Sequence, residues 1–346
     1  MQKRTLITIF ILIGILISIV FLNKNTSVKE ISKTNMYFDT VITITLYDAK
    51  ESYIDECFQI CQTYEKLFHP NLKDSDVSKI NQKAGTGEYV SVDRDTLELI
   101  ETGIRYSKLS NGSFDITLGK LSFLWGFDTF SKTGGKTSLP DESEITSVVS
   151  NIGYEQIEIK YQMVRLINKD AKLDLGGIAK GYVADKLKDY LKSKDVKHGI
   201  INLGGNILLI GTKPDKSNYH IGIQKPFSST RDYIRIVDTK DKSIVTSGIY
   251  ERYYEIDGKI YHHILDAKTG YPVENELASV TIISDKSVDG DALSTLIFTK
   301  GLEDGMEIIN NTANIEAVFI TKKGSVILSQ GIKDSEGIIS SLSQRH

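Results

Sequence analysis

Alternating apolar and polar positions along the chain predict an irregular mixture of strands and helices. The β-branched run at residues 41–47 is typical of a strand, and the apolar spacing over residues 51–68 predicts an amphipathic helix. Further helices are predicted at about residues 94–107 and 175–190, and strands at 156–161, 163–168, 200–202 and 207–210. Because strands and helices do not alternate regularly, the pattern favours an α+β fold over a doubly wound sheet.

The first part of the chain differs in character from the rest. Residues 6–22 are almost wholly apolar, they follow Lys3 and Arg4, and no small-residue cleavage site closes the run. We therefore expect a transmembrane signal anchor rather than a cleaved signal peptide, with residues 1–5 in the cytoplasm and residues 23–34 as a linker. The body, residues 35–346, is then expected outside the cytoplasm.

The composition indicates that this body is globular and argues against nucleic acid as a partner. The chain is 40% apolar and 25% charged, with a net charge of 42 − 45 = −3. This balance is typical of a folded domain and gives no electrostatic case for binding nucleic acid.

Only two cysteines occur, Cys57 and Cys61, one helical turn apart. A disulfide framework is therefore excluded. Packing in the core is the favoured interpretation, and a local disulfide or a metal or redox role remains open.

Chemistry-bearing residues gather near the C-terminal end, in residues 261–272 and 291–295. A histidine can take a proton from a nucleophile near neutral pH, and adjacent His262 and His263 would face opposite sides of a strand, so one is expected in a site. Asp291 and Thr295, four apart on a helix, offer oxygens to a hard cation such as Mg²⁺. A base beside such an ion suggests phosphoryl chemistry. The other histidines, His69, His198, His220 and His346, are not expected to be catalytic.

Three further segments are rich in glycine or hydroxyl groups. Residues 173–185 read as a glycine turn that enters a helix, where Lys180 and free N–H groups could hold a phosphate, although a purely structural turn is an equal alternative. Residues 202–206 are interpreted mainly as a turn between strands. Ser247 and Gly248 end a predicted strand, and a ligand hydrogen bond suits this serine better than nucleophilic attack because G-x-S-x-G is absent.

Taken together, these segments resemble the ApbE family of FAD:protein FMN transferases, from about residue 35 to 301. The matching segments, in family order, are residues 36–40, 112–117, 125–127, 174–185, 202–206, 246–248, 263–270 and 291–295. The resemblance implies a single ApbE-like, T-fold-related α+β domain with mixed, largely antiparallel sheets and flanking helices. It also implies Mg²⁺-dependent transfer of FMN from FAD to a Thr or Ser hydroxyl of an acceptor protein, with release of AMP.

The resemblance also implies roles for individual residues. His263 would be the base, and Asp291, Thr295 and a backbone carbonyl near Gly177 would hold Mg²⁺ or Mn²⁺. The FAD site would be lined by Met36, Asn71, Ser113, Phe114, Asp115, Asp174, Lys180, Ser247, Gly248 and Ile264. The acceptor would be a flavin-carrying protein on the outer side of the membrane.

The sequence departs from the family pattern at Ala267, where proline is common, and at Asn71, where many members have tyrosine. A more open site could let water replace the acceptor hydroxyl, so a metal-dependent FAD pyrophosphatase is one alternative. A non-catalytic, membrane-anchored flavin-binding protein is the other.

Overall fold

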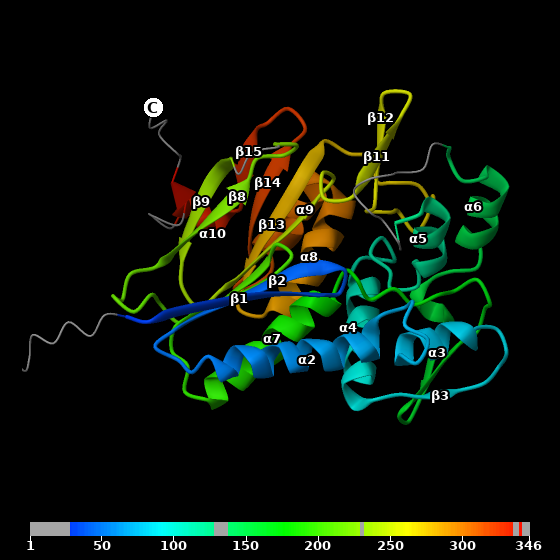
Figure 1. Ribbon diagram of the computed structural model, residues 1–346. Coiled ribbons are helices and arrows are strands. Elements are labelled where there is room, and N and C mark those ends of the chain that lie inside the picture. Colours follow the sequence, from blue (N-terminus) through cyan, green and yellow to red (C-terminus); the bar gives the residue numbers. More distant parts are fainter. Residues whose placement is uncertain (1–27, 128–137, 229–231, 335–338, 341–346) are drawn as a thin grey trace, which may run out of the picture.

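The computed structural model describes residues 28–127, 138–228, 232–334 and 339–340 (Figure 1). The predicted anchor, residues 6–22, lies outside these residues. Within the described part, no helix combines the length and apolar character needed to cross a membrane.

An antiparallel sheet of eight strands forms the centre of the fold, in the order β1-β2-β6-β7-β10-β13-β14-β15. Its strands are β1 (Glu30–Tyr37), β2 (Thr40–Tyr47), β6 (Gly199–Leu203), β7 (Asn206–Ile210), β10 (Ser243–Gly248), β13 (Leu277–Ser284), β14 (Glu316–Thr321) and β15 (Val326–Leu328). Every adjacent pair is antiparallel. The expected α+β class with largely antiparallel sheets is therefore confirmed.

The two faces of this sheet pack against different layers because successive side chains of a strand point to opposite sides. In β14, Ala317 and Phe319 join the main core with the helices, whereas Val318 and Ile320 join a smaller core beneath β8 and β9. Figure 1 shows α2, α7 and α8 on one side of the sheet and the small sheet on the other. The large helices are α2 (Ser52–Phe68), α4 (Arg94–Leu109), α7 (Ala179–Ser193), α8 (Ser287–Lys300) and α9 (Leu302–Asn310).

Smaller elements surround this framework. They are α3 (Asp76–Gln82), β3 (Val90–Ser91), α5 (Gly119–Trp125), α6 (Glu142–Val149), η1 (Tyr154–Gln156), β4 (Ile157–Lys160), β5 (Met163–Leu166), β8 (Tyr219–Gln224), β9 (Tyr233–Thr239), β11 (Tyr253–Ile256), β12 (Lys259–His262), α10 (Gln330–Asp334) and β16 (Ile339–Ser340). A third apolar cluster, centred on Trp125, packs α5 and α6 against the β11–β12 hairpin. The Trp125 indole N–H donates to the Gly270 carbonyl at 2.7 Å, which anchors the segment that follows His263.

Some expectations differ from the structure and others agree. The glycine turn expected at the entry to the helix is present at residues 176–178, and α7 begins at Ala179. Residues 30–34, expected in the linker, form the first half of β1. The short helices α5 and α6 were not predicted, and much of the loop expected before Pro140 (residues 128–137) lies outside the described residues.

Cys57 and Cys61 are free and fully buried on the inner face of α2. Burial raises the pKa of both thiols, that of Cys61 to about 12, so neither forms a reactive thiolate near neutral pH. Core packing is therefore the correct interpretation, and the alternative of a local disulfide is wrong.

Helices α7 and α8 cross at Gly181 so closely that no side chain fits between them. A Cβ atom at Gly181 would lie 2.3 Å from the Ser287 carbonyl oxygen and 2.7 Å from the Asp291 Cβ atom. Real Cβ contacts do not come this close, and the obstacle is backbone. The crossing therefore requires glycine at this position.

We expect Gly181→Ala to lower the free energy of unfolding by about 1–3 kcal/mol, because the helices must separate to admit the methyl group. Urea unfolding measures the change. Lys192→Ala, at an exposed position of the same helix, is the control and should change stability by less than about 0.5 kcal/mol. Equal stability of Gly181→Ala and the wild type would contradict the close crossing.

Candidate active site

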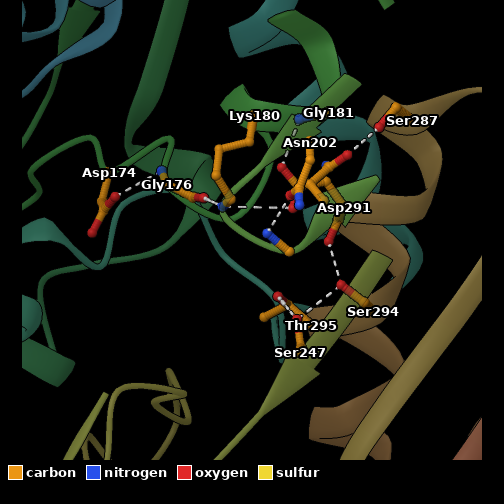
Figure 2. Close-up of polar contacts among 12 residues, drawn as sticks. Asp174, Gly176, Lys180, Gly181, Asn202, Ser247, Ser287, Asp291, Ser294 and Thr295 are labelled. Atoms are coloured by element: carbon orange, nitrogen blue, oxygen red, sulfur yellow. Dashed lines mark hydrogen bonds and ion pairs between the residues drawn. The ribbon is translucent and has the colours of Figure 1, made fainter. Parts of the chain in front are cut away.

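The crossing of α7 and α8 brings a carboxylate and an ammonium group together (Figure 2). Asp291 is buried, and its Oδ2 atom accepts the backbone N–H of Gly181 at 2.8 Å. Its Oδ1 atom lies 3.7 Å from Lys180 Nζ, beyond hydrogen-bonding distance, and can still accept a ligand. A buried carboxylate is stable only when such partners compensate its charge.

Lys180 is held by the turn that leads into α7. Its Nζ donates to the Gly176 carbonyl at 2.9 Å, and the Gly176 N–H donates to Asp174 Oδ1 at 2.8 Å. Lys180 lies in the first turn of α7, at the end of the helix where the helix dipole is positive. The turn and the helix end together form a positive region suited to phosphate oxygens.

Hydroxyl groups from strand β10 and helix α8 meet beside this region. The Ser247 Oγ atom is 2.8 Å from Ser294 Oγ and 3.1 Å from Thr295 Oγ1. Gly177 is next to them, since a Cβ atom there would lie 3.9 Å from Thr295 Oγ1 and 3.3 Å from the Phe114 ring. Gly177 and Thr295 of the predicted grouping are thus close together, and Asp291 lies one turn before Thr295 on α8.

These residues suit a hard cation rather than a soft one. Among the described residues, no three His, Cys, Asp or Glu side chains lie close enough to hold a metal by themselves. A carboxylate, a hydroxyl and a backbone carbonyl supply oxygen ligands, and Mg²⁺ normally completes such a set with water and phosphate oxygens.

His263 follows strand β12 and is oriented by the backbone of Arg252. The Arg252 carbonyl accepts the His263 backbone N–H at 3.1 Å and lies 3.2 Å from Nδ1. Because a carbonyl only accepts, Nδ1 carries the proton and Nε2 keeps its lone pair. Nε2 is therefore the atom that can remove a proton from a substrate.

The surroundings of His263 keep it neutral. Desolvation by the surrounding protein, followed by the positive charges of Arg252 and Lys180, lowers the pKa of His263 well below its ordinary value, although part of the side chain remains accessible to solvent. A lower pKa makes the imidazole a weaker base but leaves it unprotonated at neutral pH.

His262 has a different role from His263. It is the last residue of β12, so the two histidines do not share a strand as expected. Its ring is buried, its Nε2 lies 3.1 Å from the Val273 carbonyl, and its Nδ1 accepts the Ile264 N–H at 3.3 Å. Burial lowers the pKa of His262 to about 4. His262 therefore stays neutral and braces the segment that carries His263.

The remaining predicted FAD residues lie on several elements. Ser113 accepts a hydrogen bond from Thr299 of α8 at 3.1 Å, and Phe114 is buried beside Gly177. Gly248 and Ile264 are buried, and the Ile264 carbonyl accepts the N–H of Val273. Met36 and Asn71 are exposed, on β1 and on the loop between α2 and α3.

Asp115 has a structural role that the sequence did not indicate. Its Oδ1 accepts the backbone N–H and the hydroxyl of Thr117, and its Oδ2 accepts the Tyr154 N–H at 2.7 Å. Burial raises the pKa of Asp115. The residue also borders a cavity lined by Tyr154, Ala267 and Lys268.

Sequence reasoning missed the residues that hold helix α8 in place. Asp185 accepts the backbone N–H groups of Ser287 and Val288 at 2.8 and 2.9 Å, and the Ser287 hydroxyl donates to Asn206 at 2.6 Å. Asp185 thus caps α8 from a different helix. In the sequence, Asp185 lies one helical turn after Gly181 and therefore on the same helix face. This spacing could have indicated that both residues contact the same neighbouring helix.

The ApbE family profile matches residues 38–319, which is most of the chain. The chain belongs to the ApbE family. A FAD:protein FMN transferase of Klebsiella pneumoniae is 38% identical over 292 residues, covering 83% of this chain and 88% of the relative. One from Treponema pallidum is 30% identical, covering 89% of each.

Solved structures of this family share the fold. The crystal structure of the ApbE protein of Thermotoga maritima has a TM-score of 0.79 and 29% identity, covering 88% of this chain and 98% of that one. The flavin transferase ApbE of Vibrio cholerae has a TM-score of 0.78 and 26% identity, covering 89% and 99%. The family resemblance noted from the sequence is therefore confirmed.

The cap on α8 predicts a pH dependence of stability. Burial raises the pKa of Asp185 to about 6, above the value of about 3.9 for an unfolded chain, so the folded protein binds this proton more tightly. Its contribution to stability is complete below about pH 4 and is lost as the pH rises through 6.

We therefore expect the difference in unfolding free energy, wild type minus Asp185→Asn, to fall by about 2 to 3 kcal/mol between pH 4 and 6, because asparagine does not titrate. Urea unfolding at a series of pH values gives this difference. A difference that does not change with pH would contradict the assignment.

Proposed function

We propose that this chain is a FAD:protein FMN transferase, which uses Mg²⁺ or Mn²⁺ to move FMN from FAD onto a Thr or Ser hydroxyl of an acceptor protein. The observation that carries the proposal is the group formed by Lys180, Asp291 and Thr295, together with a neutral His263 whose Nε2 is free to accept a proton. Curated relatives with this activity support it.

His263 would remove the proton from the acceptor hydroxyl. The hydroxyl oxygen then forms a bond to the phosphorus of the FMN half of FAD, and the bond from that phosphorus to the bridging oxygen breaks. AMP leaves with the bridging oxygen, the proton resides on His263 Nε2, and the product is a phosphoester.

Binding and charge neutralisation fall to the other residues. Lys180 and the N-terminal end of α7 would contact the pyrophosphate, whose negative charge otherwise repels the nucleophile. Asp291, Thr295 and a backbone carbonyl near Gly177 would hold the Mg²⁺ ion, which when bound supplies further positive charge. Met36, Asn71, Ser113, Phe114, Asp115, Asp174, Ser247, Gly248 and Ile264 would line the rest of the FAD site.

We further propose that residues 6–22 anchor the chain in the membrane, with the catalytic domain on the outer side. Strand β1 begins at Glu30, so only a short stretch would separate the domain from such an anchor. The acceptor would then be a flavin-carrying protein domain exposed on the same side, with its Thr or Ser in a loop that reaches His263.

The test is to incubate the purified chain with FAD and Mg²⁺, with and without an acceptor domain, and to follow AMP and protein-bound flavin on a denaturing gel. Matched amounts of AMP and covalent flavin on the acceptor support the transferase. AMP and free FMN without an acceptor would instead identify a pyrophosphatase, and tight FAD binding with neither product would identify a flavin-binding protein.

His263→Ala should lower kcat by about 10²–10⁴-fold, the usual contribution of a general base, while FAD affinity changes little. Single-turnover AMP release gives the rate, and flavin fluorescence gives the affinity in the same samples. A variant that retains the wild-type rate would remove His263 from the mechanism.

The pH profile of kcat/KM tests the environment of His263. Because the pKa of His263 is lowered, the base stays unprotonated below neutral pH. The fall of kcat/KM on the acid side (the acid limb) should therefore have its midpoint below pH 6.5. Arg252→Met removes one of the charges that lower this pKa and should move the limb to higher pH. A wild-type limb above pH 6.5, or no movement in Arg252→Met, would contradict this description.

A further inference from the structure

His69, which the sequence did not single out for a role, joins separate parts of the chain at the end of α2. Its backbone N–H closes the helix by donating to the Glu65 carbonyl at 3.0 Å. On its side chain, Nε2 lies 3.0 Å from Asp39 Oδ2, and Nδ1 accepts the backbone N–H of Asn71 at 3.1 Å. The ring therefore links the turn between β1 and β2 to the loop between α2 and α3.

The proton positions on this ring follow from its partners. Because Nδ1 accepts from Asn71, the proton resides on Nε2, which donates to the Asp39 carboxylate. A neutral imidazole thus satisfies both contacts at once. The His69 side chain is 14% exposed and Asp39 is 77% exposed, so the ring is largely shielded while its partner is at the surface.

The turn that His69 reaches is held in an unfavourable conformation. Phe38 and Asp39 both have φ of 54°, in the left-handed region that non-glycine residues seldom adopt. Helix α2 supplies a second contact there, because the Glu65 carboxylate accepts the Phe38 N–H at 2.7 Å. These contacts add to the β1–β2 pairing that closes the turn.

Each of the linked segments carries a residue of the proposed FAD site. Met36, 67% exposed, precedes the turn in β1, and Asn71 is the partner of His69 in the loop. Neither segment belongs to α7, α8 or β10, where Lys180, Asp291 and Ser247 lie. The His69 side chain is a direct link between these two segments.

We propose that His69 is a positioning residue that holds Met36 and Asn71 ready for FAD. This inference rests on the proposed function. Preorganisation lowers the entropy lost when FAD binds, so His69 contributes to FAD affinity. The groups that perform the chemistry are held by other elements. The rate of the transfer step therefore does not depend on His69.

The experiment compares His69→Ala, Asp39→Ala and the double variant in the full chain. Asp39→Ala removes the carboxylate of the contact at an exposed position of the turn. We expect each single change to raise KM and the dissociation constant for FAD by about 5- to 10-fold, the loss expected for one typical hydrogen bond, with kcat within about twofold. The double variant should be no worse than His69→Ala, because His69→Ala already removes the contact that Asp39→Ala breaks.

His220 provides a matched control. Its Nε2 lies 3.3 Å from Asp238 Oδ2 in the β8–β9 sheet, so it forms the same kind of pair outside the proposed site. His220→Ala should leave the FAD constants unchanged. His69→Gln, whose amide offers both a donor and an acceptor, should recover part of the affinity lost in His69→Ala.

The outcomes separate this inference from the proposed function. A wild-type chain that binds FAD and transfers FMN, beside a His69→Ala variant with unchanged KM, would overturn the inference alone. A fall in kcat without a change in KM, or an equal rise of KM in His220→Ala, would also overturn it. A wild-type chain that neither binds FAD nor releases AMP would overturn the proposed function and the inference with it.

Discussion

The close approach of α7 to α8 at Gly181 determines where the charged groups of the site lie. Since no side chain separates the helices, the Asp291 carboxylate can accept the N–H of Gly181 and still face Lys180. The same crossing places Thr295, one helical turn after Asp291, beside Gly177 and Ser247. Asp185 stabilises the arrangement from the next turn of α7 by capping α8.

Charge is distributed so that each group stays in the state its chemistry needs. The buried Asp291 carboxylate is compensated by a backbone N–H and by a lysine, which leaves an oxygen for a cation. Desolvation, followed by the positive charges of Arg252 and Lys180, lowers the pKa of His263 and keeps it unprotonated. A single region thus favours a phosphate anion and a neutral base together.

Sequence patterns predicted the parts of the fold that depend on local spacing. The amphipathic helix at residues 51–68 and the grouping of Asp291 with Thr295 follow from helical periodicity, and both are present. The glycine turn before α7 was also expected, but the hydrogen bond in which Asp174 accepts the N–H of Gly176 could not be predicted from the spacing. The role of His69 depends on contacts between segments distant in sequence, which no local pattern encodes, whereas the spacing of Asp185 from Gly181 was a usable local signal.

The most direct test of this account is calorimetric titration of Mg²⁺ into the FAD-bound chain, for the wild type, Asp291→Asn and Asp289→Asn. Asparagine at position 291 keeps an oxygen for the Gly181 N–H but removes the charge. Asp289, on the same helix, bonds to Tyr106 and serves as the control. We expect Asp291→Asn to weaken Mg²⁺ binding by about tenfold or more and Asp289→Asn to leave it unchanged. Equal binding by the wild type and Asp291→Asn would contradict the central claim that the α7–α8 crossing forms the metal and phosphate site.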